Sequence, residues 1–512
     1  MTDTPWEQDA CSLVDAFRAG DRTPVEELAA TLSAIEASDL NCFSFLEPES
    51  ALKAAKSADL TKPFGGVPVG IKELEQVKGW PDTGASLVYK DRKATHTSEA
   101  TRRFIEEGGA VPVGLTTASE FGGLNVSITK LNGVAHNPWR HGRTAGGSSG
   151  GSASAVAGGL VSIASGGDGG GSIRIPAGYG GLLGMKGTYG RISRGPEAFF
   201  RPGTVVNGCL ARSVRDAARH FDVAAGLDPY DPSSLPNPGG WEKSVGTSDL
   251  TGLRVAVLPD LGVIKLEPGV EAHIRASAKE LIARHDMVEV DVDLNLPNLA
   301  VQWMMGNLST LLAELGDKWP GCANELTDEV AFGLMMSRSL YNLDVAAVAE
   351  AQRIEANIAM AKAFEQVDLI ISATNPGPAF AAEAAMSSDG DNFLEWAKSS
   401  SIAKFAFRGA LGGARLATSF FPRLPNKLVD QVAERFPDMV SMGGLTIIAN
   451  VYGNPAVSIP SGTIDGLPIG MQVMARHHRD ALLFDVARSV EVANPWPMVA
   501  PSVSEKTRVS AV

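Results

Sequence analysis

The sequence predicts an α/β fold built around a mainly parallel sheet, because short apolar segments alternate with longer amphipathic ones. Residues 67–71 (Val-Pro-Val-Gly-Ile) form an apolar run that is typical of a buried strand. Residues 98–108 then show helical periodicity, and residues 111–115 are again apolar. A strand, a helix and a second strand in this order favour a parallel pair with the helix as its crossover.

The segments on either side continue the alternation. Residues 6–37 predict two helices, and the second begins at a capping box in residues 23–26 (Thr-Pro-Val-Glu). Residues 152–158 contain helix-forming alanines, and residues 160–164 form a short apolar strand. The C-terminal half predicts strands at 253–258, 287–293, 368–372, 455–460 and 469–474, and helices at 268–285, through most of 300–365, and at 480–492. Asp465 and Gly466 predict the turn between the last two strands.

Composition excludes several classes of function. The formal net charge of the 512 residues is −13, which argues against a surface that binds the nucleic acid backbone. The N-terminus lacks a basic and apolar leader, and there is no uninterrupted apolar run of about 18 residues, so we expect no membrane span. The four cysteines are scattered and form no CxxC pair, which favours a reducing compartment. We therefore expect a cytoplasmic protein that binds neither nucleic acid nor a membrane.

Familiar cofactor and hydrolase motifs are absent from the sequence. Residues 65–72 resemble a phosphate loop, but Ile71 separates the glycine from Lys72, and no Ser or Thr follows. There is no helix-opening GxGxxG, no HExxH and no His pair at ligand spacing, so we expect neither a cofactor nor a metal. Residues 146–150 match GxSxG, but residues 137–144 before them cannot form the buried strand that a nucleophile elbow requires.

Residues 142–190 are rich in glycine and serine, yet apolar strands interrupt them, so we do not interpret them as a flexible linker. Within them stand residues 146–152 (Gly-Gly-Ser-Ser-Gly-Gly-Ser) and 168–177 (Asp-Gly-Gly-Gly-Ser-Ile-Arg-Ile-Pro-Ala). Upstream, residues 66–72 (Gly-Val-Pro-Val-Gly-Ile-Lys) end at a lysine. The three motifs resemble those of the amidase signature family, and Ser148 and Ser172 have that family's spacing of 24 residues.

The resemblance implies an α/β amidase signature fold, with a central mixed sheet flanked by helices on both faces. It also implies a triad in which Ser172 is the nucleophile, Ser148 is the bridging serine after a cis peptide, and Lys72 is the base. A serine hydroxyl needs a neighbouring base to become a good nucleophile. Lysine has a reference pKa of ~10.4, so it must be desolvated to act as a base near pH 7. The apolar run before Lys72 supplies that burial.

The glycines before Ser172 let backbone amides converge on one oxygen, as an oxyanion hole requires. By resemblance, the donors are the amides of Gly169, Gly170, Gly171 and Ser172. The neighbouring Asp168 and Arg174 have opposite charges, and we interpret them as a structural ion pair that braces the loop.

Two further groups of polar or bulky residues receive structural interpretations. Ser149 and Ser152 are interpreted as caps of the following helix. Trp303, with Met304 and Met305, is interpreted as core rather than as the lining of a pocket.

We interpret residues 1–512 as a single amidase domain whose signature core, with the triad, spans 60–220. Residues 227–250 are rich in Pro, Asp, Ser and Gly and predict a surface excursion or boundary, and residues 251–445 predict a variable, helix-rich region on the substrate side. Residues 137–139 and 190–196 resemble the branch of the family that contains 6-aminohexanoate cyclic-dimer hydrolase. Departures from the family at Glu73 and Gly169 leave the substrate open.

The predicted activity is hydrolysis of a small-molecule carboxamide through an acyl-enzyme on Ser172, with Ser148 and Lys72 as a proton relay. Carbamate (urethane), anilide and ester hydrolysis use the same triad and stay open. Two different functions also stay open: that of a glutamyl-tRNA amidotransferase A subunit, which works with partner subunits, and that of a non-catalytic binding protein on an amidase scaffold. The intact triad disfavours the last of these. A homodimer is also left open.

Because the predicted chemistry uses only serine, lysine and backbone groups, neither EDTA nor added nicotinamide cofactors should change the rate of hydrolysis. The check is to assay the enzyme before and after chelation. Loss of activity that a single metal ion restores would contradict the prediction.

Overall fold

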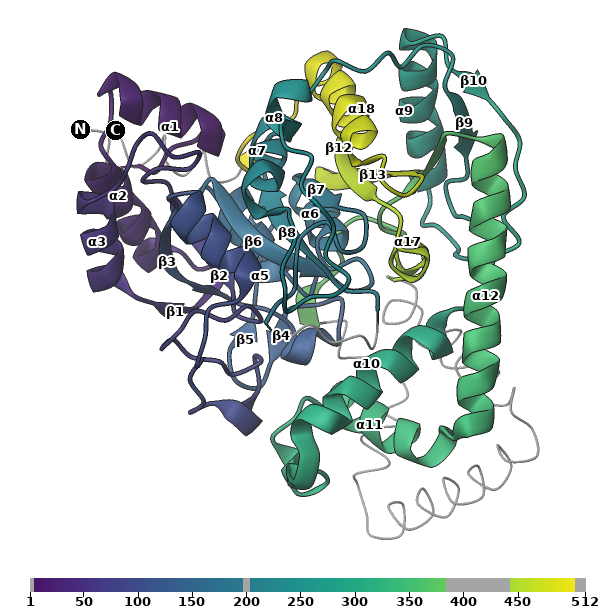
Figure 1. Ribbon diagram of the computed structural model, residues 1–512, viewed down its shortest axis with the longest axis horizontal. Helices are drawn as coiled ribbons and strands as arrows, with labels where there is room; N and C mark the ends of the chain where they lie inside the picture. The colour runs from purple at the N-terminus through teal and green to yellow at the C-terminus, as the bar shows by residue number, and fades with distance from the viewer. Residues whose placement is uncertain (1–3, 197–202, 384–442, 502–512) are drawn as a thin grey trace.

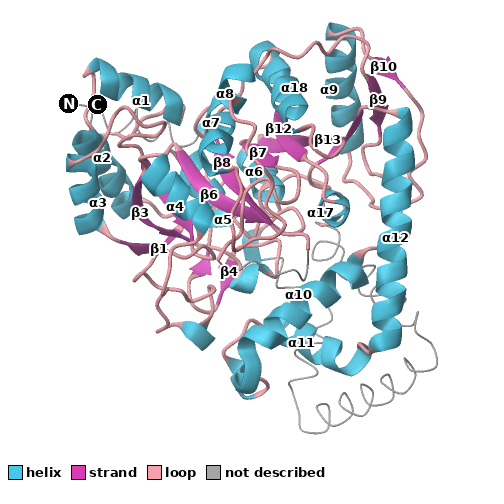
Figure 2. Ribbon diagram, viewed as in Figure 1, coloured by secondary structure: helices cyan, strands magenta, loops and turns pink. Residues whose placement is uncertain are grey.

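The computed structural model describes residues 4–196, 203–383 and 443–501, and these residues form one 11-stranded sheet with helices packed on it (Figures 1 and 2). The strands lie in the order β1-β3-β2-β6-β8-β7-β12-β13-β11-β9-β10. Their bounds are β1 Phe43–Leu46, β2 Pro68–Lys72, β3 Val111–Thr116, β6 Ile163–Asp168, β7 Leu183–Lys186, β8 Val206–Ala211, β9 Arg254–Val257, β10 Val288–Glu289, β11 Leu369–Ala373, β12 Ala456–Ile464 and β13 Leu467–Ala475. A separate hairpin joins β4 (Ile128–Thr129) to β5 (Gly133–Val134).

The α-helices are distributed along the described chain. They are α1 Ala10–Ala19, α2 Pro24–Ala37, α3 Pro48–Lys56, α4 Glu99–Arg102, α5 Gly150–Ala157, α6 Arg174–Gly180, α7 Val214–Ala224, α8 Trp241–Ser244, α9 Val270–Arg284, α10 Ala300–Leu315, α11 Asp328–Leu340, α12 Leu343–Gln366, α17 Ile447–Tyr452 and α18 Asp480–Ala493. None of those described is both long and apolar enough to cross a membrane. Part of the predicted region 251–445, namely residues 384–442, lies outside the described residues.

Two hydrophobic clusters cover opposite faces of the sheet. Side chains alternate between the faces of a strand, so Leu210 of β8 belongs to one cluster and its neighbours Cys209 and Ala211 belong to the other. Helices α2, α3 and α5 contribute to the first cluster, and α1, α7, α9 and α18 contribute to the second. The predicted α/β layering, with helices on both faces of a central sheet, is therefore confirmed.

The sheet is mixed, as the family resemblance implies, and the expectation of a mainly parallel sheet is wrong. Six neighbouring pairs are antiparallel and four are parallel. The parallel pairs lie toward the two ends of the sheet, and the antiparallel strands β8, β7, β12 and β13 fill its middle. Strands β7 and β8 were not predicted, because β7 has only four residues and Asn207 and Gly208 interrupt the apolar pattern of β8.

Most local signals lie where the sequence predicts them. The capping box at Thr23 and Glu26 is present, and Asp465 and Gly466 have positive φ angles in the turn between β12 and β13. Other boundaries differ. The strand predicted at 160–164 begins only at Ile163 and runs on to Asp168, because the preceding helix continues into a turn at Gly158. The strand predicted at 287–293 is reduced to two exposed residues of β10 at the sheet edge.

Helix α5 is buried along its whole length and packs closely on the sheet. Its first turn contains Gly150 and Gly151, where the helix meets the segment after β3. A Cβ atom at Gly151 would overlap the backbone nitrogen, the carbonyl oxygen and the hydroxyl of Thr117. The backbone contacts leave no flexible side chain that could give way, so this position requires glycine.

Gly151→Ala should lower the free energy of unfolding by about 1–3 kcal/mol through overpacking. Gly321→Ala is the matched control, because a Cβ there meets no atom of the described residues within 4 Å and its φ angle is not positive. We expect the control to change stability by less than about 0.5 kcal/mol. Urea unfolding followed by circular dichroism measures both values, and equal stability of the two variants would contradict the packing argument.

Candidate active site

Lys72 is the last residue of β2 and lies between the parallel strands β3 and β6. Its side chain is nearly inaccessible, at 2% exposure. Lys72 Nζ donates to Ser148 Oγ at 2.7 Å and to the carbonyl oxygen of Gly167 at 3.2 Å. The predicted apolar strand therefore ends in a buried amine that contacts one of the two predicted serines directly.

Ser148 begins the turn into α5 and follows a cis peptide bond from Gly147, as the resemblance implies. The backbone carbonyl of Ser148 accepts a hydrogen bond from the amide of Ser119 at 3.3 Å. The next residue, Ser149, donates its amide to the carbonyl of Ser172 at 3.3 Å. This backbone contact brings the loop of the second serine against the loop of the first.

Ser172 lies between the end of β6 and the start of α6 and is 5% exposed. Strands β2 and β6 are parallel neighbours, so Lys72 and the Ser172 loop come from the same edge of the sheet. Within the described part of the chain, Ser172 Oγ makes no hydrogen bond to Ser148 Oγ. The structure thus shows the Lys72–Ser148 half of the relay and places Ser172 beside it, and the catalytic roles stay predictions.

Burial is the main influence on the charge of Lys72, and it lowers the pKa of that amine to about 8. The carboxylates of Glu75, Asp168 and Glu73 oppose the shift by stabilising the ammonium form. Glu75 is itself buried, and burial raises its pKa above the ordinary value. One of its carboxylate oxygens accepts from Thr101 Oγ1 at 3.0 Å. The lysine therefore lies among buried acidic groups.

Glu73, the departure from the family beside Lys72, has its own set of partners. Its carboxylate accepts from the amide of Ala118 at 2.6 Å and from Asn132 Nδ2 at 2.9 Å. Burial raises the pKa of Glu73 to about 7 despite these hydrogen bonds. These contacts connect the end of β2 to the segment after β3 and to the β4–β5 hairpin.

Asp168 and Arg174 form the predicted ion pair, with Arg174 Nε 2.9 Å from Asp168 Oδ2 and both side chains at 0% exposure. Arg174 also donates to Gln472 Oε1 and to Asn450 Oδ1, each at 2.6 Å. Although burial opposes ionisation, the Arg174 charge holds the pKa of Asp168 well below its usual range. The pair braces the loop between them, as predicted.

The same carboxylate changes the predicted set of oxyanion donors. The amide of Gly171 donates to Asp168 Oδ1 at 2.7 Å, so it points toward the ion pair rather than toward a substrate. Within the described residues, the amides of Gly169, Gly170 and Ser172 have no such acceptor. The oxyanion prediction now depends on these three groups.

Two structural interpretations need correction. Ser149 occupies the N-cap position of α5, but its hydroxyl donates to Gly167 O rather than capping the helix. Ser152 lies inside the helix, and its hydroxyl pairs with Thr116 Oγ1 at 2.7 Å. The buried helix start explains both, because the neighbouring strands offer closer partners than the first-turn amides.

Trp303 also does more than the predicted core packing. It is half-buried and packs against the larger cluster, but its indole Nε1 donates to the carbonyl of Gly169 at 2.8 Å. A bulky residue in a helical segment gives no signal of such a contact, because the partner lies 134 positions away in the chain.

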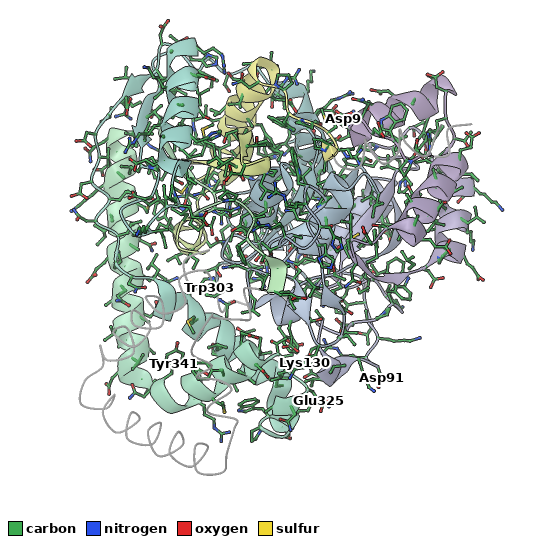
Figure 3. All side chains as sticks on the ribbon, turned by 180° about the vertical axis from the view of Figure 1, so that it is seen from behind. Asp9, Asp91, Lys130, Trp303, Glu325 and Tyr341 are labelled. Carbon is green, nitrogen blue, oxygen red and sulfur yellow. The ribbon has the colours of Figure 1, made fainter. Side chains whose placement is uncertain are left out.

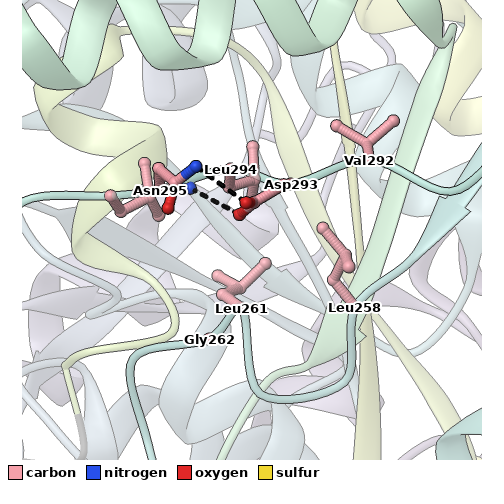
Figure 4. Close-up of a pocket in the computed structure, with 8 residues that line it drawn as sticks. Leu258, Leu261, Gly262, Val292, Asp293, Leu294 and Asn295 are labelled. Carbon is pink, nitrogen blue, oxygen red and sulfur yellow. Dashed lines mark hydrogen bonds between the residues drawn. The ribbon is translucent and has the colours of Figure 1, made fainter.

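Within the described residues, no cluster of three or more His, Cys, Asp or Glu side chains could hold a metal ion. A hollow of about 300 Å³ lies beside β9, toward the opposite end of the sheet from Lys72 (Figure 4). Asp293 and Asn295 on its rim are hydrogen-bonded to each other at 2.8 Å, and apolar side chains such as Leu258 line the rest.

The chain belongs to the amidase family, which it matches over residues 26–411 and 416–484. It is similar to the A subunit of the glutamyl-tRNA(Gln) amidotransferase of Salinispora tropica, with 31% identity over 526 residues that cover 95% of this chain and 97% of that protein. The family predicted from the sequence, and with it the class of amide-cleaving enzymes, is confirmed.

Solved structures place the fold in the same family. The structure of 6-aminohexanoate cyclic dimer hydrolase superposes with a TM-score of 0.80 at 26% identity and covers 97% of this chain and 99% of that one. A bacterial aryl acylamidase of the amidase signature family superposes with a TM-score of 0.82 at 22% identity, over 97% and 98% of the two chains. The predicted likeness to the cyclic-dimer hydrolase branch is thus confirmed.

The buried acidic groups around Lys72 lead to a prediction about the pH dependence of the rate. A base must be neutral, so the rate of acylation should rise with pH through an ionisation near the lowered pKa of Lys72, about 8. Glu75 is the strongest of the charges that favour the ammonium form. Glu75→Gln removes that charge, so the rising limb should move to lower pH.

The profile is measured with a p-nitroanilide or p-nitrophenyl ester of a short fatty acid. Glu289→Gln is the control, because Glu289 is exposed on β10 at the far edge of the sheet and should leave the midpoint unchanged. A midpoint that stays in place in Glu75→Gln, or moves to higher pH, would show that Glu75 does not act on the base.

Proposed function

We propose that this enzyme hydrolyses carboxamide C–N bonds of small molecules through an acyl-enzyme on Ser172, with Ser148 and Lys72 as its proton relay. The observation that carries the proposal is the 2.7 Å hydrogen bond between Lys72 Nζ and Ser148 Oγ in a buried site. A lysine at this depth with a lowered pKa is a base, and its first contact is a hydroxyl that can pass on a proton.

The relay runs in a defined order. Neutral Lys72 accepts the proton of Ser148 while keeping its own hydrogen bond to Gly167 O. Ser148 takes the proton of Ser172, whose Oγ attacks the carbonyl carbon and forms a tetrahedral oxyanion. The proton then returns from Lys72 through Ser148 to the leaving nitrogen, and the C–N bond breaks. Water, deprotonated by the same relay, hydrolyses the ester on Ser172.

Backbone amides stabilise the oxyanion in this proposal. The groups that lack an acceptor in the described structure are those of Gly169, Gly170 and Ser172. A single donor of this kind contributes about 3–4 kcal/mol to the transition state. The same intermediate forms from carbamates, anilides and esters, so the triad supports those substrates equally.

A second candidate is an amidotransferase A subunit that works with partner subunits. The observation that favours it is the 31% identity, over nearly the whole chain, to a protein of that name. Gel filtration of the purified chain combined with an amidase assay separates the candidates. If the purified chain hydrolyses amides without any partner subunit, the hydrolase is supported. If it is active only after partner subunits are added, the second candidate is supported.

Ser172→Ala should abolish hydrolysis, with a fall of at least ~10⁴-fold in kcat, while the fold is retained. Ser162→Ala is the matched control, because Ser162 is buried just before β6, the strand that leads to Ser172, and its hydroxyl has no hydrogen-bond partner among the described residues. Activity assays and thermal unfolding of both variants test this. Near wild-type turnover in Ser172→Ala would show that another residue is the nucleophile.

A further inference from the structure

The loop before Ser172 has its first two peptide planes held from distant parts of the chain. The carbonyl oxygen of Asp168 accepts from Asn450 Nδ2 of α17 at 2.9 Å. The next carbonyl, of Gly169, accepts from Trp303 Nε1 of α10 at 2.8 Å. Both donors are side chains, and each comes from more than 130 positions away.

The following two planes are held as well. The carbonyl of Gly170 accepts from Thr446 Oγ1 at 2.5 Å, and the carbonyl of Gly171 accepts from the amide of Ile175 at 2.7 Å. Each of the four successive carbonyl groups therefore has a donor. Glycine offers little conformational restraint of its own, so these contacts determine how the planes are oriented.

In a planar trans peptide the carbonyl of one residue and the N–H of the next point in opposite directions. Fixing the Gly169 carbonyl toward Trp303 therefore turns the Gly170 amide to the other side of the loop. That amide is one of those without an acceptor among the described residues. By the same rule, Thr446 turns the Gly171 amide toward its observed acceptor, Asp168 Oδ1.

Trp303 also determines the space around the next glycine. A Cβ atom at Gly170 would lie 2.7 Å from Trp303 Nε1, so the indole ring covers this part of the loop. Figure 3 shows Trp303 near the body of the molecule, whereas Tyr341 and Glu325 lie farther out, in the helical region around α10 and α11. Among the described side chains of α10, Trp303 thus contacts the loop before Ser172.

The helical region is anchored near Ser148 by a second contact. The buried carboxylate of Glu120 accepts from the amide and the hydroxyl of Thr327, both at 2.7 Å, just before α11. Gly122, two residues after Glu120, is where a Cβ atom would lie 3.6 Å from Ser148 Oγ. Helix α10 is therefore held against the loop of Ser172, and the start of α11 is held against the segment beside Ser148.

We infer that Trp303 is a positioning residue of the oxyanion site, whose indole N–H fixes the Gly169 carbonyl and so aims the Gly170 amide at the developing oxyanion. The inference rests on the proposed function of Ser172. It makes the orientation of helix α10 a condition of acylation, because the donor that orients the loop belongs to that helix.

The test uses an alkyl fluorophosphonate, which needs no knowledge of the natural substrate. Ser172 Oγ attacks phosphorus, the P–F bond breaks, fluoride leaves, and the serine proton passes to the relay. Negative charge develops on the phosphoryl oxygen during attack, so the oxyanion donors affect the rate. Intact-protein mass spectrometry over a range of probe concentrations yields the limiting rate of labelling, kinact, and the binding constant of the probe, KI.

Trp303→Phe removes the indole N–H and keeps an aromatic ring. We expect kinact to fall by about tenfold or more, with KI within about twofold of wild type, because an oxyanion donor acts on the transition state rather than on binding. Replacement of Trp303 by benzothienylalanine, which has the shape of tryptophan but no N–H, should give the same fall. This second variant tests the N–H even if the phenylalanine variant fails to fold.

Trp319→Phe is the matched control, because Trp319 lies in the same helical region and its indole nitrogen has no hydrogen-bond partner in the described part of the chain. We expect its kinact to equal that of wild type. An unchanged kinact in the benzothienylalanine variant, a change confined to KI, or an equal fall in Trp319→Phe would overturn the inference. Ser172→Ala is labelled in parallel, and an adduct that persists in that variant would instead overturn the proposed function.

Discussion

The ion pair between Asp168 and Arg174 is the interaction on which the rest of the site depends. Both side chains are fully buried, so the energy of removing two charges from water must be offset by their contacts. Asp168 accepts from Arg174, Asn450 and the amide of Gly171, and Arg174 also donates to Gln472. Breaking such a pair typically costs about 3–5 kcal/mol, because one buried charge is left without a partner.

The ion pair also explains how distant segments meet at one loop. Asn450 is on α17 and Gln472 is on β13, both far along the chain from the loop after β6. Once these residues satisfy the charges, α17 lies beside the loop, and Thr446, just before that helix, reaches the carbonyl of Gly170. The hydrogen bonds to the ion pair therefore do two things. They hold the ends of the loop together, and they place Asn450 and Thr446 where these side chains donate to the loop carbonyl groups.

The sequence predicts the parts of the site that depend on local pattern. The apolar run predicts the strand that ends at Lys72, and the serine motifs predict the two turns that hold Ser148 and Ser172. The structure brings this strand end and these turns together. Of the four antiparallel strands in the middle of the sheet, β12 and β13 were predicted but β7 and β8 were not, because β7 has only four residues and Asn207 and Gly208 interrupt the apolar pattern of β8. The mixed sheet followed only from the resemblance.

The residues that sequence analysis missed act across long separations. Trp303, Thr446 and Asn450 contact the loop from 134 to 282 positions away, and each does so through a single side-chain donor. One tryptophan in a helix has the same local pattern whether its N–H is free or bound. The hydrogen bond from the Gly171 amide to Asp168 could not be predicted from the sequence for a related reason. A run of glycines does not specify the direction of its peptide planes.

The acidic groups around Lys72 complete the account of why this lysine can be a base. Burial alone would lower its pKa further, and the carboxylates of Glu75, Asp168 and Glu73 raise it again, so that the balance lies at about 8. At pH 7 about a tenth of such lysines are neutral, compared with less than about one in a thousand at the reference pKa. A base of much lower pKa would be neutral more often but would accept a proton less readily and return it more easily. The carboxylates thus set the pKa of the lysine between these limits, and Asp168, which braces the Ser172 loop, contributes to both the geometry and the proton affinity of the proposed relay.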